Sequence, residues 1–75
     1  MEFNKEFDAS GETCPGPVIS TKKVLASMAS GQILRVIATD PGSVHDMATL
    51  AEHSGHALMK QVNEDSKFVF YLRKA

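Results

Sequence analysis

Cysteine is almost absent from this chain, since Cys14 is the only one among 75 residues. A single cysteine cannot form an internal disulfide. It also cannot run a dithiol redox cycle, which needs a second thiol to resolve the first. A disulfide framework and thioredoxin-like chemistry within one chain are therefore excluded. The thiol is expected to stay reduced, as thiols do in the cytoplasm.

Long apolar runs and an excess of one charge are missing as well. No apolar stretch approaches the roughly 20 residues that a membrane-spanning helix needs, so we expect no membrane span. The first six residues are rich in charge, and we therefore expect no signal peptide. The formal net charge is −1, without a block of like charges. This balance argues against direct nucleic-acid binding through a basic surface.

The length of 75 residues predicts one domain over residues 1–75, and the spacing of apolar residues predicts the element order βαβαββ. Residues that alternate between apolar and polar types predict strands, and apolar residues three and four apart predict helices. The expected strands cover residues 3–9, 32–39, 56–62 and 67–74, and the expected helices cover 15–29 and 44–54. Ser43 with Asp46 fits a capping box at the start of the second helix, and Asp40 before Pro41 is an alternative N-cap. In the first strand Phe3, Lys5, Phe7 and Ala9 should share one face.

The connections between these elements predict a mixed four-stranded sheet. The first two strands should be parallel because a helix joins them, and the last two should form a hairpin around the polar residues 63–66. Two helices cannot cover both faces of such a sheet, so both should pack on one face. The fold class is then α+β, a two-layer sandwich. Ile33, Ile37, Val69 or Tyr71 should form a partly exposed apolar face, a candidate contact surface.

The stretch Thr13-Cys14-Pro15-Gly16-Pro17 places the only thiol at the start of the first expected helix. Prolines suit a first helical turn because the N–H groups there have no partner within the helix. The free N–H groups of Gly16 and Val18 should then favour a thiolate at the positive end of the helix. We therefore predict a pKa of Cys14 below the ordinary value of about 8.5.

Two lysines, Lys22 and Lys23, follow one to two turns into the same helix. They would add positive potential near Cys14 and could attract an acidic surface on a partner protein. The more usual role of exposed lysines is to be solvated, which we keep as the alternative.

The sequence gives less support for a catalytic or metal-binding role of the three histidines than for a role of Cys14. A Cys/His pair with His45, His53 or His56 is conceivable, but no oxyanion-hole pattern accompanies it. The three histidines and Cys14 also lack the spacing of metal ligands. We expect neither a metal nor a cofactor.

A single accessible cysteine can carry a group: it attacks a donor, holds the product as a thioester or persulfide, and yields it to an acceptor thiol. Two alternatives stay open. The chain could be a non-catalytic regulatory interaction module in which Cys14 is an inert small hydrophobe. It could also be a single-thiol redox sensor that peroxide oxidises.

Several segments together resemble the TusA (SirA-like) family of sulfur carriers. Residues 8–17, D-A-S-G-E-T-C-P-G-P, are similar to the family's opening L-D-A-x-G-x-x-C-P-x-P. Gly31 before I-L-R-V, D-P-G-S-V-H-D at 40–46 and G-H at 55–56 resemble its later motifs. The C-P-x-P tetrapeptide alone is weak, but with these spacings the match is strong. The chain departs from the family pattern at Phe7, where leucine is usual, and has glycine at the variable position 16.

The resemblance implies a βαβαββ sandwich in which Cys14 takes up sulfane sulfur as a persulfide. As a sulfurtransferase-type protein co-substrate, it would pass that sulfur to a partner cysteine. The implied donors are a cysteine desulfurase, which holds its own pyridoxal phosphate, or a rhodanese that uses thiosulfate. The implied acceptors are DsrE-like proteins or a heterodisulfide-reductase-like complex. The pathway would be tRNA 2-thiouridine formation or dissimilatory sulfur and thiosulfate metabolism, and the variant D-P-G-S at 40–43 favours the latter.

Overall fold

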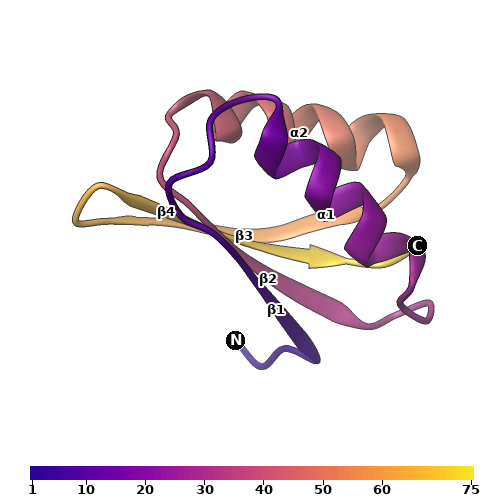
Figure 1. The fold of residues 1–75 in the computed structure, drawn as a ribbon. Helices are drawn as coiled ribbons and strands as arrows, with labels where there is room; N and C mark the ends of the chain where they lie inside the picture. Colours follow the sequence, from indigo (N-terminus) through magenta and orange to yellow (C-terminus); the bar gives the residue numbers. More distant parts are fainter.

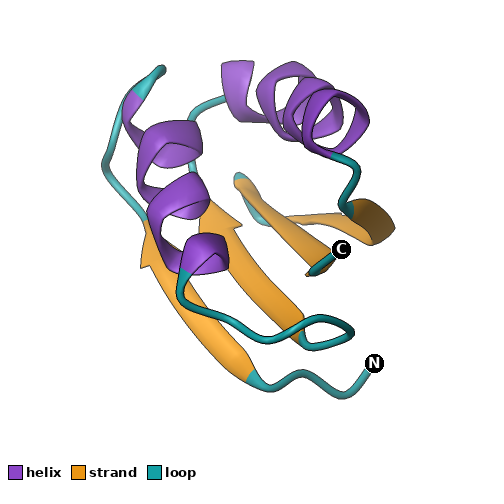
Figure 2. Cartoon of the chain, turned by 90° about the vertical axis from the view of Figure 1, so that its right-hand side faces the viewer, coloured by secondary structure: helices purple, strands orange, loops and turns teal.

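Six elements follow the predicted order in the computed structural model, which describes all 75 residues (Figure 1). They are β1 (Lys5–Ala9), α1 (Gly16–Ala26), β2 (Ile33–Ala38), α2 (Gly42–Ser54), β3 (Ala57–Glu64) and β4 (Lys67–Arg73). The four strands form one sheet in the order β1-β2-β4-β3. Both helices lie in a single layer on one face of that sheet (Figure 2). The prediction of an α+β two-layer sandwich is confirmed.

The strand pairing also follows the predicted pattern. β1 and β2 are parallel, with Ala9 opposite Ala38, whereas β4 is antiparallel to both β2 and β3. The hairpin between β3 and β4 closes through Asp65 and Ser66, which both have positive φ. Such a two-residue turn matches the right-handed twist of its strands. Neither helix is long and apolar enough to cross a bilayer.

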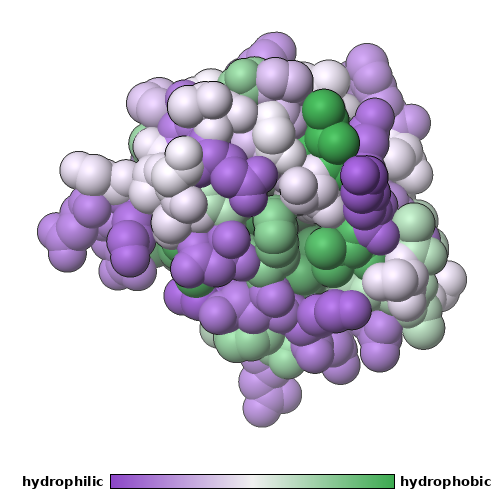
Figure 3. All heavy atoms as spheres, in the orientation of Figure 1, coloured by the Kyte–Doolittle hydropathy of each residue, from purple (hydrophilic) through white to green (hydrophobic).

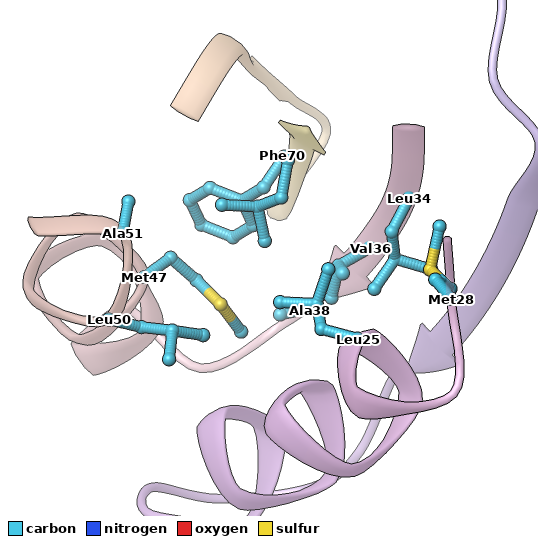
Figure 4. Packing of buried hydrophobic residues seen from close by; sticks show 10 residues of the cluster. Leu25, Met28, Leu34, Val36, Ala38, Met47, Leu50, Ala51 and Phe70 are labelled. Carbon is cyan, nitrogen blue, oxygen red and sulfur yellow. The ribbon is translucent and has the colours of Figure 1, made fainter. Parts of the chain in front are cut away.

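A single apolar core fills the space between the helices and the sheet (Figure 4). Leu25 comes from α1, Met47 from α2, Val36 from β2, and Phe70 and Leu72 from β4; all five are essentially inaccessible to solvent. Full burial of one such side chain contributes about 1.5–3 kcal/mol. The core therefore fixes both helices against the sheet. On the face shown in Figure 3, hydrophilic and near-neutral residues make up most of the surface, and hydrophobic residues are seen near its middle and at its upper right.

Three helix boundaries differ from the predictions: α1 begins at Gly16 rather than at residue 15 and ends at Ala26 rather than at 29, and α2 begins at Gly42 rather than at 44. α1 ends at Ala26, three residues before the predicted end, where the side chain of Ser27 donates a hydrogen bond to the carbonyl of Val24 at 2.7 Å. α2 begins without a side-chain cap, although both Asp40 and a box of Ser43 with Asp46 had the right spacing for one. The two aspartates instead contact the β1–α1 loop.

The face of the sheet opposite the helices is only partly apolar. Ile33, Ile37 and Tyr71 are partly exposed there, as predicted. Val69 is not, because its cross-strand neighbours Ile37 and Val62 leave it 3% exposed.

Phe3 lies on this opposite face too, so its predicted place beside Lys5 and Phe7 is wrong. It precedes β1, and its ring lies 6.3 Å from that of Tyr71 and 5.6 Å from the Arg35 guanidinium. Arg35 also forms an ion pair with Glu6 at 2.5 Å. The alternation of β1 does not extend to Phe3 because the strand begins only at Lys5.

One buried hydroxyl in α1 allows a test of the packing. Thr21 is fully buried and its Oγ1 has no hydrogen-bond partner. Because a buried unpaired hydroxyl costs about 1–3 kcal/mol, we expect Thr21→Val to raise the free energy of unfolding by about 1 kcal/mol. Urea denaturation measures this, with Thr49→Val in the open cleft described below as the control. A loss of stability in Thr21→Val would show that the hydroxyl is satisfied.

Candidate functional site

Cys14 lies in the loop between β1 and α1 and is exposed to solvent. β1 and β2 are neighbouring parallel strands, so the loops that follow them leave the same end of the sheet (Figure 1). The first of these loops leads into α1 and the second into α2. The start of α2 is thereby placed beside the cysteine, although the two are about 30 residues apart in sequence.

Three hydrogen bonds join these two loops and the start of α2. The backbone N–H of Gly11 donates to Oγ1 of Thr39 at 2.9 Å. The backbone N–H of Cys14 donates to Oδ2 of Asp40 at 2.8 Å. The thiol of Cys14 donates to Oδ2 of Asp46 at 2.6 Å. The cysteine is thus fixed at both its backbone and its sulfur.

A glycine at the start of α2 leaves room for this contact. A Cβ on Gly42 would lie 3.2 Å from Oδ2 of Asp40 and 3.5 Å from the Cβ of Cys14. The first distance is tighter than most Cβ contacts, and it involves the oxygen that holds the Cys14 N–H. A side chain at residue 42 would therefore push against the anchor of the cysteine.

The electrostatic environment of Cys14 is the reverse of the predicted one. The hydrogen bond to the Asp46 carboxylate raises the pKa of the thiol above its ordinary value, and partial desolvation and the charges of Asp46 and Asp40 add to this rise. A neighbouring negative charge disfavours a second one, so the thiol keeps its proton. The prediction of a lowered pKa for Cys14 is wrong.

The N–H groups that were expected to stabilise a thiolate do not contact the sulfur, and this explains why the predicted pKa shift has the wrong direction. The N–H of Gly16 donates to the carbonyl of Thr13 at 2.8 Å rather than to the sulfur. No N–H group, including that of Val18, donates to Sγ. Pro17 occupies the first turn of α1 as predicted, but it is buried. The start of the helix therefore places Cys14 without stabilising its anion.

A cleft of about 380 Å³ opens beside Cys14 between α1 and α2. Two apolar side chains, Val18 and Leu50, contribute to its walls, together with the charged Lys22. Its complete lining is Cys14, Pro15, Val18, Lys22, Asp46, Thr49, Leu50, His53 and Ser54. The exposed cysteine thus lies where a bound segment of a partner could reach it.

The other residues that the sequence singled out divide into two groups. Lys22 lines the cleft and Lys23 does not. His53 lines the cleft without a hydrogen bond to Cys14, whereas Nδ1 of His56 accepts the N–H of Ala75 far along the chain. No cluster of three or more His, Cys, Asp or Glu side chains could hold a metal ion.

Asp40 and Asp46 both contact Cys14, and neither was predicted to belong to this site. Their spacing in the sequence is typical of a helix cap, whereas in the structure both contact Cys14 from another part of the chain. The usable signal was topological: both residues follow β2, whose end lies beside the end of β1.

The fold and the site define a small α+β domain that presents one exposed thiol beside a cleft between two helices. The family model described as sulfurtransferase TusA matches residues 5–74, and this chain belongs to the TusA family. The sulfur carrier protein TusA of Allochromatium vinosum is 49% identical over 74 residues, which are 99% of this chain and 97% of that protein. The TusA of Pseudomonas putida is 36% identical over 68 residues, with 91% of this chain and 85% of that protein covered.

A solved structure supports the same assignment. The crystal structure of a SirA-like protein from Desulfitobacterium hafniense superposes with a TM-score of 0.84 at 26% identity. The match covers 93% of this chain and 96% of that one. The earlier resemblance to the TusA family is confirmed over nearly the whole chain.

The pKa of Cys14 can be tested by alkylation. Because only the thiolate reacts, the iodoacetamide rate should rise with pH through a midpoint above that of free cysteine measured alongside. Asp46→Asn removes the negative charge beside Sγ and should move the midpoint down. Glu52→Gln, on the same helix but outside the cleft, is the matched control and should leave it unchanged. A wild-type midpoint below that of free cysteine would contradict the structure.

Proposed function

We propose that this protein carries sulfane sulfur as a persulfide on Cys14 and relays it to a cysteine of a partner protein. The observation that supports this most directly is the exposure of the only thiol at the edge of the cleft between α1 and α2. A cysteine that served only as a small core hydrophobe would be buried. The names of the relatives, sulfur carrier proteins, agree with a carrier role.

The chemistry requires only one thiol on the carrier. The sulfur of Cys14 bonds to the terminal sulfur of the donor's persulfide, and the donor's own sulfur leaves with the electrons of the broken S–S bond. The reverse step delivers the sulfur to the acceptor thiol. The protein therefore acts as a co-substrate of two partners and needs no cofactor of its own.

We infer the partners of such a carrier from the motifs that it shares with the family. The donor is a cysteine desulfurase or a rhodanese, and the acceptor is of the DsrE-like or heterodisulfide-reductase-like type. The sulfur then enters dissimilatory sulfur or thiosulfate metabolism, or tRNA 2-thiouridine formation, without direct contact between this chain and nucleic acid. The cytoplasm, where thiols stay reduced, is the compartment that suits this chemistry.

The redox-sensor alternative is less well supported than the carrier. Peroxide reacts with thiolates, and sensor cysteines therefore have a low pKa. The Asp46 carboxylate raises the pKa of Cys14, which lowers the thiolate fraction at neutral pH. The raised pKa of this thiol therefore slows its oxidation by peroxide.

Sulfur loading can be measured by intact mass. After incubation with a cysteine desulfurase and cysteine, or with a rhodanese and thiosulfate, the wild type should gain the mass of one sulfur atom. Cys14→Ser should gain none, because no other thiol is present. A gain that persists in Cys14→Ser would contradict the carrier role. If Cys14→Ala kept both partner binding and the cellular phenotype, the interaction-module alternative would replace it.

Lys22 and Lys23 make a matched pair for a test of partner docking. Lys22 lines the cleft and Lys23, its neighbour on α1, does not. If an acidic donor surface docks over the cleft, Lys22→Glu should slow loading by a protein donor a few-fold at low salt, as expected for an exposed charge pair. Lys23→Glu should have a smaller effect. If both variants were loaded at the wild-type rate at every ionic strength, the two lysines would be merely solvated.

A further inference from the structure

The proton on the Cys14 sulfur poses a chemical problem for any sulfur transfer. Sγ holds this proton in the hydrogen bond to Asp46 and must lose it when it bonds to another sulfur. A protonated sulfur within an S–S bond is a strong acid, so the proton has to leave as the bond forms. A carrier that transfers sulfur quickly therefore benefits from a fixed proton acceptor beside Sγ.

Asp46 is the only side chain that contacts this proton. Its Oδ2 lies 2.6 Å from Sγ, within the range in which a side chain can take a proton directly. Asp40 is occupied with the backbone N–H of Cys14. Lys22 and His53 line the same cleft, and neither is hydrogen-bonded to Sγ. The geometry leaves one candidate.

We propose that Asp46 is a catalytic residue of sulfur transfer, which passes the Cys14 proton to the leaving donor sulfur on loading and passes the acceptor's proton to Sγ on delivery. The proposal rests on Cys14 being the thiol that carries sulfur. It assigns to the carrier itself a part of the chemistry that would otherwise fall to the donor and acceptor.

The loading step balances with a donor persulfide R–S–SH. A lone pair of Sγ bonds to the terminal sulfur of the donor, while the S–H proton of Cys14 moves to Oδ2 of Asp46. The S–S bond of the donor breaks, and its electron pair leaves with R–S, which takes up the proton from Asp46. The sum is Cys14–SH plus R–S–SH giving Cys14–S–SH plus R–SH, with one S–S bond replacing another and no external oxidant.

Delivery runs the same steps backwards. The acceptor thiol attacks the outer sulfur of Cys14–S–SH, and the bond between the two sulfurs breaks toward Sγ. The acceptor's proton reaches Sγ through Asp46, and the S–H···O hydrogen bond re-forms. This bond stabilises the thiol as the product, so the geometry favours release of the sulfur.

Asp46 could instead only suppress the thiol, and a single variant separates the two roles. Asp46→Asn keeps the side-chain shape and removes the proton acceptor. If the carboxylate accepts the proton, Asp46→Asn should load sulfur about 100-fold more slowly, although iodoacetamide should alkylate it faster at neutral pH. If the carboxylate only suppresses the thiol, both rates should rise together.

The experiment uses glutathione persulfide as the donor, so that protein docking does not enter. Quenched time points are analysed by intact mass for wild type, Asp46→Asn, Asp46→Glu and the surface control Glu52→Gln. We expect slow loading only in Asp46→Asn, with partial recovery in Asp46→Glu because a carboxylate is restored. The wild-type rate should fall in D₂O, and this isotope effect should be smaller in Asp46→Asn.

Two results would overturn the role of Asp46: loading of Asp46→Asn at or above the wild-type rate, or a wild-type rate that does not change in D₂O. The second result is decisive even if Asp46→Asn folds poorly. Failure of the carrier role looks different, because the wild type itself would then gain no sulfur on Cys14. The role of Asp46 would fall with it.

Discussion

The hydrogen bond from the Cys14 thiol to Asp46 is the interaction on which the site depends. It exists because β1 and β2 are parallel neighbours, so that the loop carrying Cys14 and the start of α2 meet at one end of the sheet. The core positions the two helices against that sheet, and the bond from Asp40 to the Cys14 backbone completes the anchor. The site is thus a consequence of the topology rather than of any one segment.

This arrangement gives the only thiol two properties that normally conflict. An exposed cysteine is open to attack by partners and by oxidants alike, and reactivity toward oxidants follows the thiolate fraction. By raising the pKa of Cys14, Asp46 keeps that fraction low in the free protein. The same carboxylate stands ready to take the proton when a sulfur donor arrives. Protection and reactivity then come from one contact, which suits a carrier that meets several partners.

Local patterns in the sequence predicted much of the fold but little of this contact. The alternation in residues 67–74 and the polar turn before it placed the final hairpin, and the prolines placed the start of α1. The side of the sheet on which Phe3 lies and the burial of Val69 could not be predicted from the sequence, because both depend on where neighbouring strands begin and end. The local spacing around Asp46 is typical of a helix cap, and no local pattern indicates a contact with Cys14, which is 32 residues away. Because this contact was not predicted, the predicted direction of the Cys14 pKa shift was wrong.

The protonation of Cys14 in the free protein can be observed directly. Because the chain has a single cysteine, its Raman S–H stretching band has only one source and can be followed through a pH titration. We expect the band to persist to higher pH than that of free cysteine and to shift to higher frequency in Asp46→Asn, where the hydrogen bond is weaker. A band that disappears near neutral pH, or that is the same in both proteins, would contradict the central place given to the bond between Cys14 and Asp46.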